Sequence, residues 1–273
     1  AARPRGRAGG GAGRRDAGVA ASELGLLVVV SCTGYGTPGL DIRLTAELGM
    51  APEVRRLVVG HMGCYAAIPG LGAATDFVRA RGLPAAVVCV ELPSLHIQPP
   101  PAERDLEQVV AHGLFGDAAA AIVLEPDAPH GFAVLDTTAA TIEATSSLMT
   151  WEITDRGFRM GLSPEVPDAL AEHVADITAA LLKSHGRVIG DVAGWAVHPG
   201  GPRVVDVVTE RLALPASATA ATRLVLDQHG NCSSGTVLLV LAALRESLRP
   251  GDDVVAMAFS PGLTLCSALL QNR

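Results

Sequence analysis

Short aliphatic runs alternate, in the first third of the chain, with segments whose apolar residues have helical spacing. Residues 26–30 and 85–90 have the length and composition of strands that are buried on both faces, and residues 56–60 have those of a second short strand. Residues 39–48 and 65–81, which separate these runs, have the spacing or small-residue content of helices. This strand–helix alternation predicts parallel βαβ units and therefore an α/β fold.

The later part of the chain repeats the same order. Strands are predicted at 118–124 and 131–138, followed by a long amphipathic helix at 166–183. Further strands and helices are predicted at 192–197, 204–212, 233–248, 254–259 and 263–269. Two similar α/β halves, each with a loop directly after a strand, indicate an internal pseudo-repeat. We therefore expect a flexible Gly/Arg-rich tail at residues 1–18, one half at 19–150 and a second half at 151–273.

Composition and charge narrow the class of protein. The 273 residues are 49% hydrophobic and 18% charged, which excludes a disordered chain, and five cysteines are too few for a disulfide scaffold. No apolar run reaches the roughly 18 residues of a membrane span, and no secretory signal is recognisable. The first 16 residues carry five Arg and one Asp, so the rest of the chain is acidic, which argues against nucleic-acid binding. We expect a cytoplasmic protein with free thiols and no membrane or nucleic-acid partner.

A glycine-rich turn follows the first predicted strand. Gly34, Gly36 and Gly39 fit the G-x-G-x-x-G pattern of dinucleotide-binding turns, which would indicate a nicotinamide-dependent oxidoreductase. However, no acidic residue ends the next strand, and Pro38 lacks an N–H group that could bind a phosphate. The segment is better interpreted as a tight strand-to-helix turn.

Cys64 lies between the end of a predicted strand and the start of a helix. The positive end of a helix dipole lowers the pKa of a thiol placed there and favours the nucleophilic thiolate. Gly63, directly before it, allows a sharp turn. The alternative is a small buried residue of the core, as the sequence predicts for Cys89 and Cys266.

Two further strand ends carry candidate catalytic side chains. His198 follows a buried strand and begins a Pro/Gly turn, which is a usual place for a catalytic base, although a turn residue is the alternative. Asn231 opens a predicted helix, where its amide could donate to an oxyanion or only cap the helix. A nucleophile, a base and an oxyanion donor on three strand-end loops could converge into one site. The G-x-S-x-G, Walker, H-E-x-x-H and C-x-x-C patterns are absent, so a hydrolase, a nucleoside triphosphatase and a metal site lack support from the sequence.

These motifs together resemble the type III polyketide synthases, the chalcone-synthase-like family. The resemblance covers residues 20–273 and rests on segments in the family's order and spacing: Gly63-Cys64, 114–117 (Leu-Phe-Gly-Asp), 198–202 (His-Pro-Gly-Gly-Pro), 230–234 (Gly-Asn-Cys-Ser-Ser) and 259–264 (Phe-Ser-Pro-Gly-Leu-Thr). The 198–202 stretch separates this family from the ketoacyl-carrier-protein synthases. The resemblance implies a thiolase-like layered αβαβα fold with two pseudo-repeated halves, and a homodimer.

The resemblance also implies roles for individual residues. Cys64 would accept the acyl group, and His198 would pair with its thiolate and, with Asn231, hold the malonyl thioester oxygen. Phe115 matches the first gatekeeper of the family's pocket, and an ungapped alignment places Met160 at the second, with Phe158 as the alternative occupant. The remaining residues that the resemblance assigns to the pocket are Cys32, Thr33, Thr37, Pro93, His96, Ser233, Pro261 and Gly262. Of these, Thr37 would reach into the partner's pocket, and Cys32-Thr33-Gly34 is similar to the bacterial members.

The activity implied is the iterative decarboxylative condensation of malonyl-CoA onto an acyl-CoA starter held on Cys64. Cyclisation to a pyrone, resorcinol or similar aromatic product would follow, and no metal, flavin or nicotinamide is required. Alternatives are a ketoacyl synthase III-like condensing enzyme or a non-catalytic truncated fragment. The truncated fragment is an alternative because members of the family have a further βα segment before the position of Leu26. That segment carries basic residues that bind CoA. Without it we expect an unpaired sheet edge.

Overall fold

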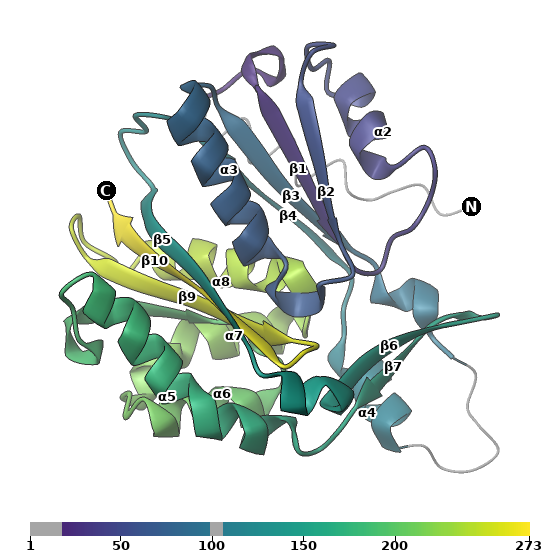
Figure 1. The fold of residues 1–273 in the computed structure, drawn as a ribbon, viewed down its shortest axis with the longest axis vertical. Helices are drawn as coiled ribbons and strands as arrows, with labels where there is room; N and C mark the ends of the chain where they lie inside the picture. Colours follow the sequence, from purple (N-terminus) through teal and green to yellow (C-terminus); the bar gives the residue numbers. More distant parts are fainter. Residues whose placement is uncertain (1–17, 99–105) are drawn as a thin grey trace.

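Two four-stranded mixed sheets form the frame of the chain, and helices lie between them and on their outer faces (Figure 1). The computed structural model describes residues 18–98 and 106–273. The flexible tail predicted for residues 1–18 lies outside the described residues, apart from Gly18.

The first sheet has the strand order β2-β1-β3-β4. Its strands are β1 (Leu26–Ser31), β2 (Arg55–Gly60), β3 (Ala85–Glu91) and β4 (Ala118–Leu124). β1 runs parallel to β2 and β3, whereas β4 is antiparallel to β3. The aliphatic residues of β1 and β3 are buried on both faces of the sheet, as their continuous apolar runs predict for central strands.

The second sheet has the order β5-β10-β9-β8. Its strands are β5 (Phe132–Thr141), β8 (Val192–Val197), β9 (Asp253–Ser260) and β10 (Thr264–Asn272). β8 is parallel to β9, and β10 is antiparallel to both of its neighbours. β5 lies before the boundary expected at residue 150 but belongs to this second sheet, and the boundary itself stays a prediction.

Helices complete five layers in the predicted αβαβα order (Figure 1). The helices are α2 (Leu40–Glu47), α3 (Ala67–Arg81), α5 (Val166–Ser184), α6 (Pro202–Arg211), α7 (Ala220–His229) and α8 (Thr236–Arg245). α3 and α8 lie between the sheets, α2 covers the outer face of the first sheet, and α5 and α6 cover that of the second. The small residues of α3 permit this close packing, because a Cβ on Gly70 would lie 3.2 Å from Val30 and one on Gly72 would lie 2.7 Å from Thr137.

The two halves repeat one arrangement, which confirms the predicted pseudo-repeat. β1, β3 and β4 correspond to β8, β9 and β10, since in each set the first two strands are parallel and the third is antiparallel. A short turn precedes the central helix of each half: η2 (Gly63–Tyr65) before α3 and η7 (Ser233–Gly235) before α8. β5 adds an antiparallel strand beside β10, and no described residue forms a strand at the matching place beside β4. β4 is therefore an unpaired edge in the described part of the chain, as expected.

A two-stranded hairpin interrupts this repeat and was not predicted. It consists of β6 (Met149–Thr154) and β7 (Gly157–Leu162), and it packs against α4 (Leu106–Leu114) and the 3₁₀ helix η3 (Pro93–His96). α7 was also missed. Further 3₁₀ turns are η1 (Ala21–Glu23), η4 (Glu143–Leu148), η5 (Ile189–Asp191) and η6 (Ala216–Thr219). Within the described ranges, no helix has both the length and the apolar character needed to span a bilayer.

Candidate active site

Cys64 lies in η2, at the point where the chain leaves β2 and enters α3. Its side chain is 3% exposed, and its backbone N–H donates to the Ser260 hydroxyl at 2.8 Å. Gly63 has φ +73°, and a Cβ at this position would lie 2.1 Å from Ser260 Oγ. Glycine is therefore required before the thiol both by conformation and by the close approach of the second sheet.

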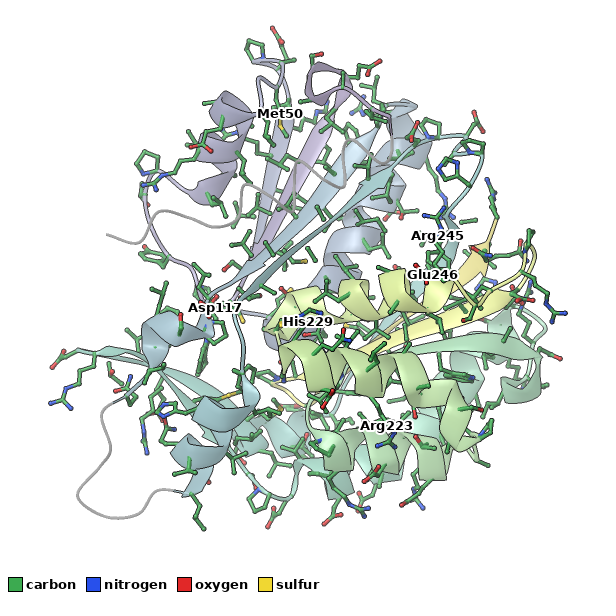
Figure 2. All side chains as sticks on the ribbon, turned by 180° about the vertical axis from the view of Figure 1, so that it is seen from behind. Met50, Asp117, Arg223, His229, Arg245 and Glu246 are labelled. Atoms are coloured by element: carbon green, nitrogen blue, oxygen red, sulfur yellow. The ribbon has the colours of Figure 1, made fainter. Side chains whose placement is uncertain are left out.

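Asn231 occupies the equivalent place in the second half and reaches the thiol. Cys64 Sγ lies 3.9 Å from Asn231 Oδ1, which also accepts the Ser233 N–H at 2.9 Å. Asn231 Oδ1 thus accepts hydrogen bonds from the chain, and Nδ2 is the donor that this side chain could offer to a substrate oxygen. The Asn231 backbone bonds Leu114 and Gly116, so the segment around Phe115 lies directly beside it. Figure 2 shows this region from behind and labels Asp117 and His229, and the backbone of Gly116 lies close to the His229 carbonyl at the end of α7.

His198 follows β8, at the same end of the second sheet as Ser260. Its backbone N–H donates to the Met257 carbonyl at 2.8 Å, and its side chain is completely buried. Neither ring nitrogen has a hydrogen-bond partner. An unpaired imidazole is costly in a buried place, and both of its nitrogens remain free to bond a ligand.

Burial sets the charge state of this site. It raises the pKa of the Cys64 thiol to about 11, an effect that hydrogen bonds from Ser233, Ser260 and Asn231 oppose. Burial also lowers the pKa of His198 to about 3. Burial thus favours the neutral form of each group, which opposes the thiolate–imidazolium pair that the family resemblance implies.

A buried carboxylate that the sequence analysis missed lies beside these residues. Glu91 ends β3, is completely buried, and accepts hydrogen bonds from Cys32, Thr33 and Ser234. Cys32 Sγ lies 3.0 Å from the Ser233 hydroxyl, which places both predicted pocket residues next to the nucleophile. The available signal in the sequence was an acidic residue at the end of an otherwise aliphatic strand.

A cavity of about 220 Å³ adjoins this cluster between η3, α4 and the hairpin. Its walls include the predicted residues Phe115, Met160, Pro93 and His96, and also Trp151, which the sequence analysis missed. Trp151 Nε1 donates to the Cys32 carbonyl at 2.8 Å, so the wall of the cavity touches the nucleophile's surroundings.

Three rings that contact one another form one side of the cavity. His96 stacks on Phe158 with 4.5 Å between ring centroids, and Trp151 packs against both. His96 also bonds the Thr33 carbonyl at 2.7 Å through Nε2, while its Nδ1 accepts the Phe158 N–H at 3.1 Å. The imidazole is thus held in one tautomer, and it ties the hairpin to the end of β1.

The remaining predicted residues divide into two groups. Pro261 and Gly262 follow β9, and Pro261 approaches Gly63 beside the nucleophile. Thr37, by contrast, is exposed in the loop between β1 and α2, and nothing in the described structure brings it to Cys64 within one chain. The Gly34 N–H in the same turn is already used by the Ser31 hydroxyl at 2.9 Å. Within residues 18–98 and 106–273, no group of three or more His, Cys, Asp or Glu side chains is placed to hold a metal ion.

The fold and these motifs define a member of a known family. The chain matches the N-terminal domain of the chalcone and stilbene synthases over residues 7–128 and their C-terminal domain over residues 134–272. It belongs to this family, the type III polyketide synthases, and has their thiolase-like fold.

Individual relatives support this assignment. The alpha-pyrone synthesis polyketide synthase-like protein Pks18 of Mycobacterium tuberculosis is 34% identical over 90% of this chain, and 1,3,6,8-tetrahydroxynaphthalene synthase of Streptomyces peucetius is 36% identical over 93%. The chain spans 64% of the mycobacterial protein and 69% of the Streptomyces protein.

Solved structures agree with the sequence relatives. Tetrahydroxynaphthalene synthase of Streptomyces coelicolor matches 96% of this chain and 76% of its own, with a TM-score of 0.91 and 27% identity. The polyketide synthase PKS-I of the brown alga Ectocarpus siliculosus matches 95% of this chain and 71% of its own, with a TM-score of 0.87 and 33% identity.

The raised pKa of Cys64 predicts how its alkylation depends on pH. Thiolate is the minor form at neutral pH, so the rate of reaction with iodoacetamide should keep rising from about pH 6 to about pH 10. Peptide mass mapping would follow Cys64, and Cys89, whose pKa burial raises to about 12, serves as the internal comparison. An alkylation rate that already reaches its maximum near neutral pH would contradict a neutral Cys64 thiol. It would indicate that Cys64 is a thiolate at that pH.

Proposed function

We propose that this chain catalyses the decarboxylative condensation of malonyl-CoA onto an acyl-CoA starter that is bound covalently to Cys64. The observation that carries the proposal is the meeting of Cys64 and Asn231 at the starts of the two central helices, 3.9 Å apart from Sγ to Oδ1. The other support is family membership, together with the buried, unpaired imidazole of His198 at the same end of the second sheet.

In acyl loading, the Cys64 thiol would transfer its proton to His198. The neutral forms of both groups imply that this transfer accompanies the attack of Sγ on the acyl-CoA carbonyl. A carbon–sulfur bond forms to Cys64, the bond to CoA breaks, and the CoA thiolate leaves with the proton from His198. The buried thioester is then shielded from hydrolysis.

Chain extension would use Asn231 and His198 as donors. Malonyl-CoA loses CO₂, and the electron pair of the broken bond becomes an enolate on the thioester. The Asn231 amide and a ring N–H of His198 donate to the enolate oxygen, where negative charge develops. The carbanion attacks the Cys64 thioester, and Sγ leaves and is reprotonated. Each cycle lengthens the chain by two carbons.

The half-reactions separate the roles of the two residues. Cys64→Ala should abolish both acyl loading and condensation because no nucleophile remains. Asn231→Ala should lower malonyl-CoA decarboxylation by about 10²–10³-fold while leaving loading largely intact, since the amide acts on the developing oxyanion. Intact-protein mass spectrometry measures loading, and release of labelled CO₂ measures decarboxylation. Full turnover by Cys64→Ala, or equal losses in both half-reactions for Asn231→Ala, would refute these roles.

We propose that the aromatic wall of the cavity, formed by His96, Trp151 and Phe158, selects the starter and limits the number of extensions. The finished chain would then be released as a pyrone, a resorcinol or a similar aromatic product. The supporting observation is the small cavity, whose volume of about 220 Å³ lies below the roughly 300–1,000 Å³ of ordinary ligand pockets. The names of two relatives refer to an alpha-pyrone and to tetrahydroxynaphthalene, which are products of this chemical class.

Trp151 tests this proposal. Trp151→Ala should enlarge the cavity and extend the products by at least one two-carbon unit, or admit longer acyl-CoA starters. Trp151→Phe is the matched control, because it keeps a ring but removes the hydrogen bond to Cys32. Liquid chromatography with mass spectrometry would compare the products over a series of starters. If Trp151→Ala makes products of unchanged length from an unchanged range of starters, the aromatic wall does not determine these properties.

We also propose a homodimer formed through β2. This edge strand exposes the large apolar residues Leu57 and Val58 at 40% and 57%, and an exposed apolar strand edge favours pairing with another chain. The exposed loop that contains Thr37 joins the neighbouring strand β1 to α2, so a partner across β2 would also face Thr37. The proposal accounts for a predicted pocket residue that lies far from its own site.

A charge in the proposed interface should separate the subunits. Val58→Asp is expected to sediment as a monomer, because an unpaired carboxylate would be buried in the dimer. Val188→Asp changes an equally exposed valine away from β2 and should remain dimeric. Analytical ultracentrifugation distinguishes these states, and a monomeric unmodified chain would disprove the dimer.

A further inference from the structure

Glu91 is a fully buried carboxylate with an unusually complete set of donors. The Cys32 N–H lies 3.2 Å from Oε1 and 3.1 Å from Oε2, and the Thr33 hydroxyl donates to Oε2 at 2.7 Å. The Ser234 hydroxyl donates to Oε1 in a short hydrogen bond. Burial raises the pKa of Glu91, and the hydrogen bonds from these donors oppose that rise.

The direction of one of these bonds is fixed by the neighbouring backbone. The Thr33 hydroxyl oxygen accepts the Leu92 N–H at 2.8 Å, so its own proton points to Glu91. Glu91 therefore acts as the acceptor that joins the end of β1 to the start of η7. These segments come from opposite halves of the chain.

The segment that Glu91 holds in the second half is strained. Ser233 has φ +48°, a left-handed conformation that is unfavourable for a residue with a side chain. Such a conformation persists only where its surroundings enforce it. Here the Ser233 N–H bonds the Asn231 side chain, the Ser233 hydroxyl contacts Cys32 Sγ, and the next residue, Ser234, bonds Glu91.

This turn also fixes the orientation of the Asn231 amide. Because the Ser233 N–H occupies Asn231 Oδ1, relaxation of Ser233 would release the amide to rotate and would remove its Nδ2 protons from the substrate side. Glu91 has no described contact with the Asn231 side chain itself. Its influence passes through Ser234 and through Cys32, which contacts Ser233.

We propose that Glu91 is a positioning residue that holds the strained turn at residues 231–234 and thereby presents the Asn231 amide to the malonyl thioester. The proposal rests on the function proposed above for Asn231. It assigns to the buried carboxylate a much larger effect on decarboxylation than on acyl loading at Cys64.

The experiment compares Glu91→Ala, Glu91→Gln and Ser234→Ala in the full chain. Glu91→Gln keeps an acceptor of the same shape without the charge, and Ser234→Ala removes only the bond from the turn. Asp41→Ala is the matched control, because Asp41 is another largely buried carboxylate, 8% exposed and paired with Arg56 away from the site. Acyl loading, decarboxylation and amide hydrogen exchange of peptides that cover residues 229–236 are measured for each.

We expect Glu91→Ala to lose about 10²-fold in decarboxylation, the scale of a roughly 1 Å misplacement, while acyl loading stays within about threefold. Exchange at residues 229–236 should accelerate in Glu91→Ala and less in Ser234→Ala, whereas Glu91→Gln and Asp41→Ala should resemble the unmodified chain. If Glu91→Ala fails to fold, the comparison of Ser234→Ala with Glu91→Gln still tests whether the bond between Ser234 and Glu91 holds the turn.

Three results would overturn the positioning role: equal losses in both half-reactions, a Glu91→Gln variant as impaired as Glu91→Ala, or unchanged exchange in the turn for both Glu91→Ala and Ser234→Ala. An unmodified chain that neither loads nor decarboxylates would refute the proposed function instead. In that case hydrogen exchange still decides whether Glu91 holds the turn.

Discussion

The contact between two helix-starting turns, one from each half, is the constraint on which the site depends. Cys64 lies in the first turn and Asn231 lies two residues before the second, and each turn contains a residue with positive φ, Gly63 in the first and Ser233 in the second. The turns precede α3 and α8, which share the central layer, so the packing of the two halves brings the thiol and the amide together. A shift between the halves would separate these groups without changing either half.

Burial gives the site its electrostatic character. The thiol and the imidazole both favour their neutral forms, and the charge that decarboxylation would create must be met by donors that are already in place. Glu91 is a buried carboxylate close to this site, and its charge is compensated by donors from both halves. The same interactions that make its burial tolerable also tie together the loops that carry the reactive groups.

The frame that carries the candidate catalytic residues and the cavity beside it have separate structural origins. The pseudo-repeat supplies Cys64, His198 and Asn231 at corresponding strand and helix ends, whereas the hairpin and η3, which fall outside the repeat, supply the aromatic wall. Trp151 and His96 bond the carbonyls of Cys32 and Thr33, so the wall is fixed to the frame. This separation allows the cavity to change shape without moving the nucleophile, as expected for a family that carries one reaction to different products.

The sequence by itself determined the α/β class, the pseudo-repeat and the three candidate catalytic residues, because aliphatic runs, glycine turns and motif spacing are local properties. It missed the β6–β7 hairpin, since short half-exposed strands such as β6 lack a distinct hydrophobic period. Only the tertiary structure decided that Glu91 bonds Cys32, Thr33 and Ser234, because its partners are up to 143 positions distant along the chain. The same holds for the exposed position of Thr37 and for the neutral states of Cys64 and His198, which depend on burial by distant elements.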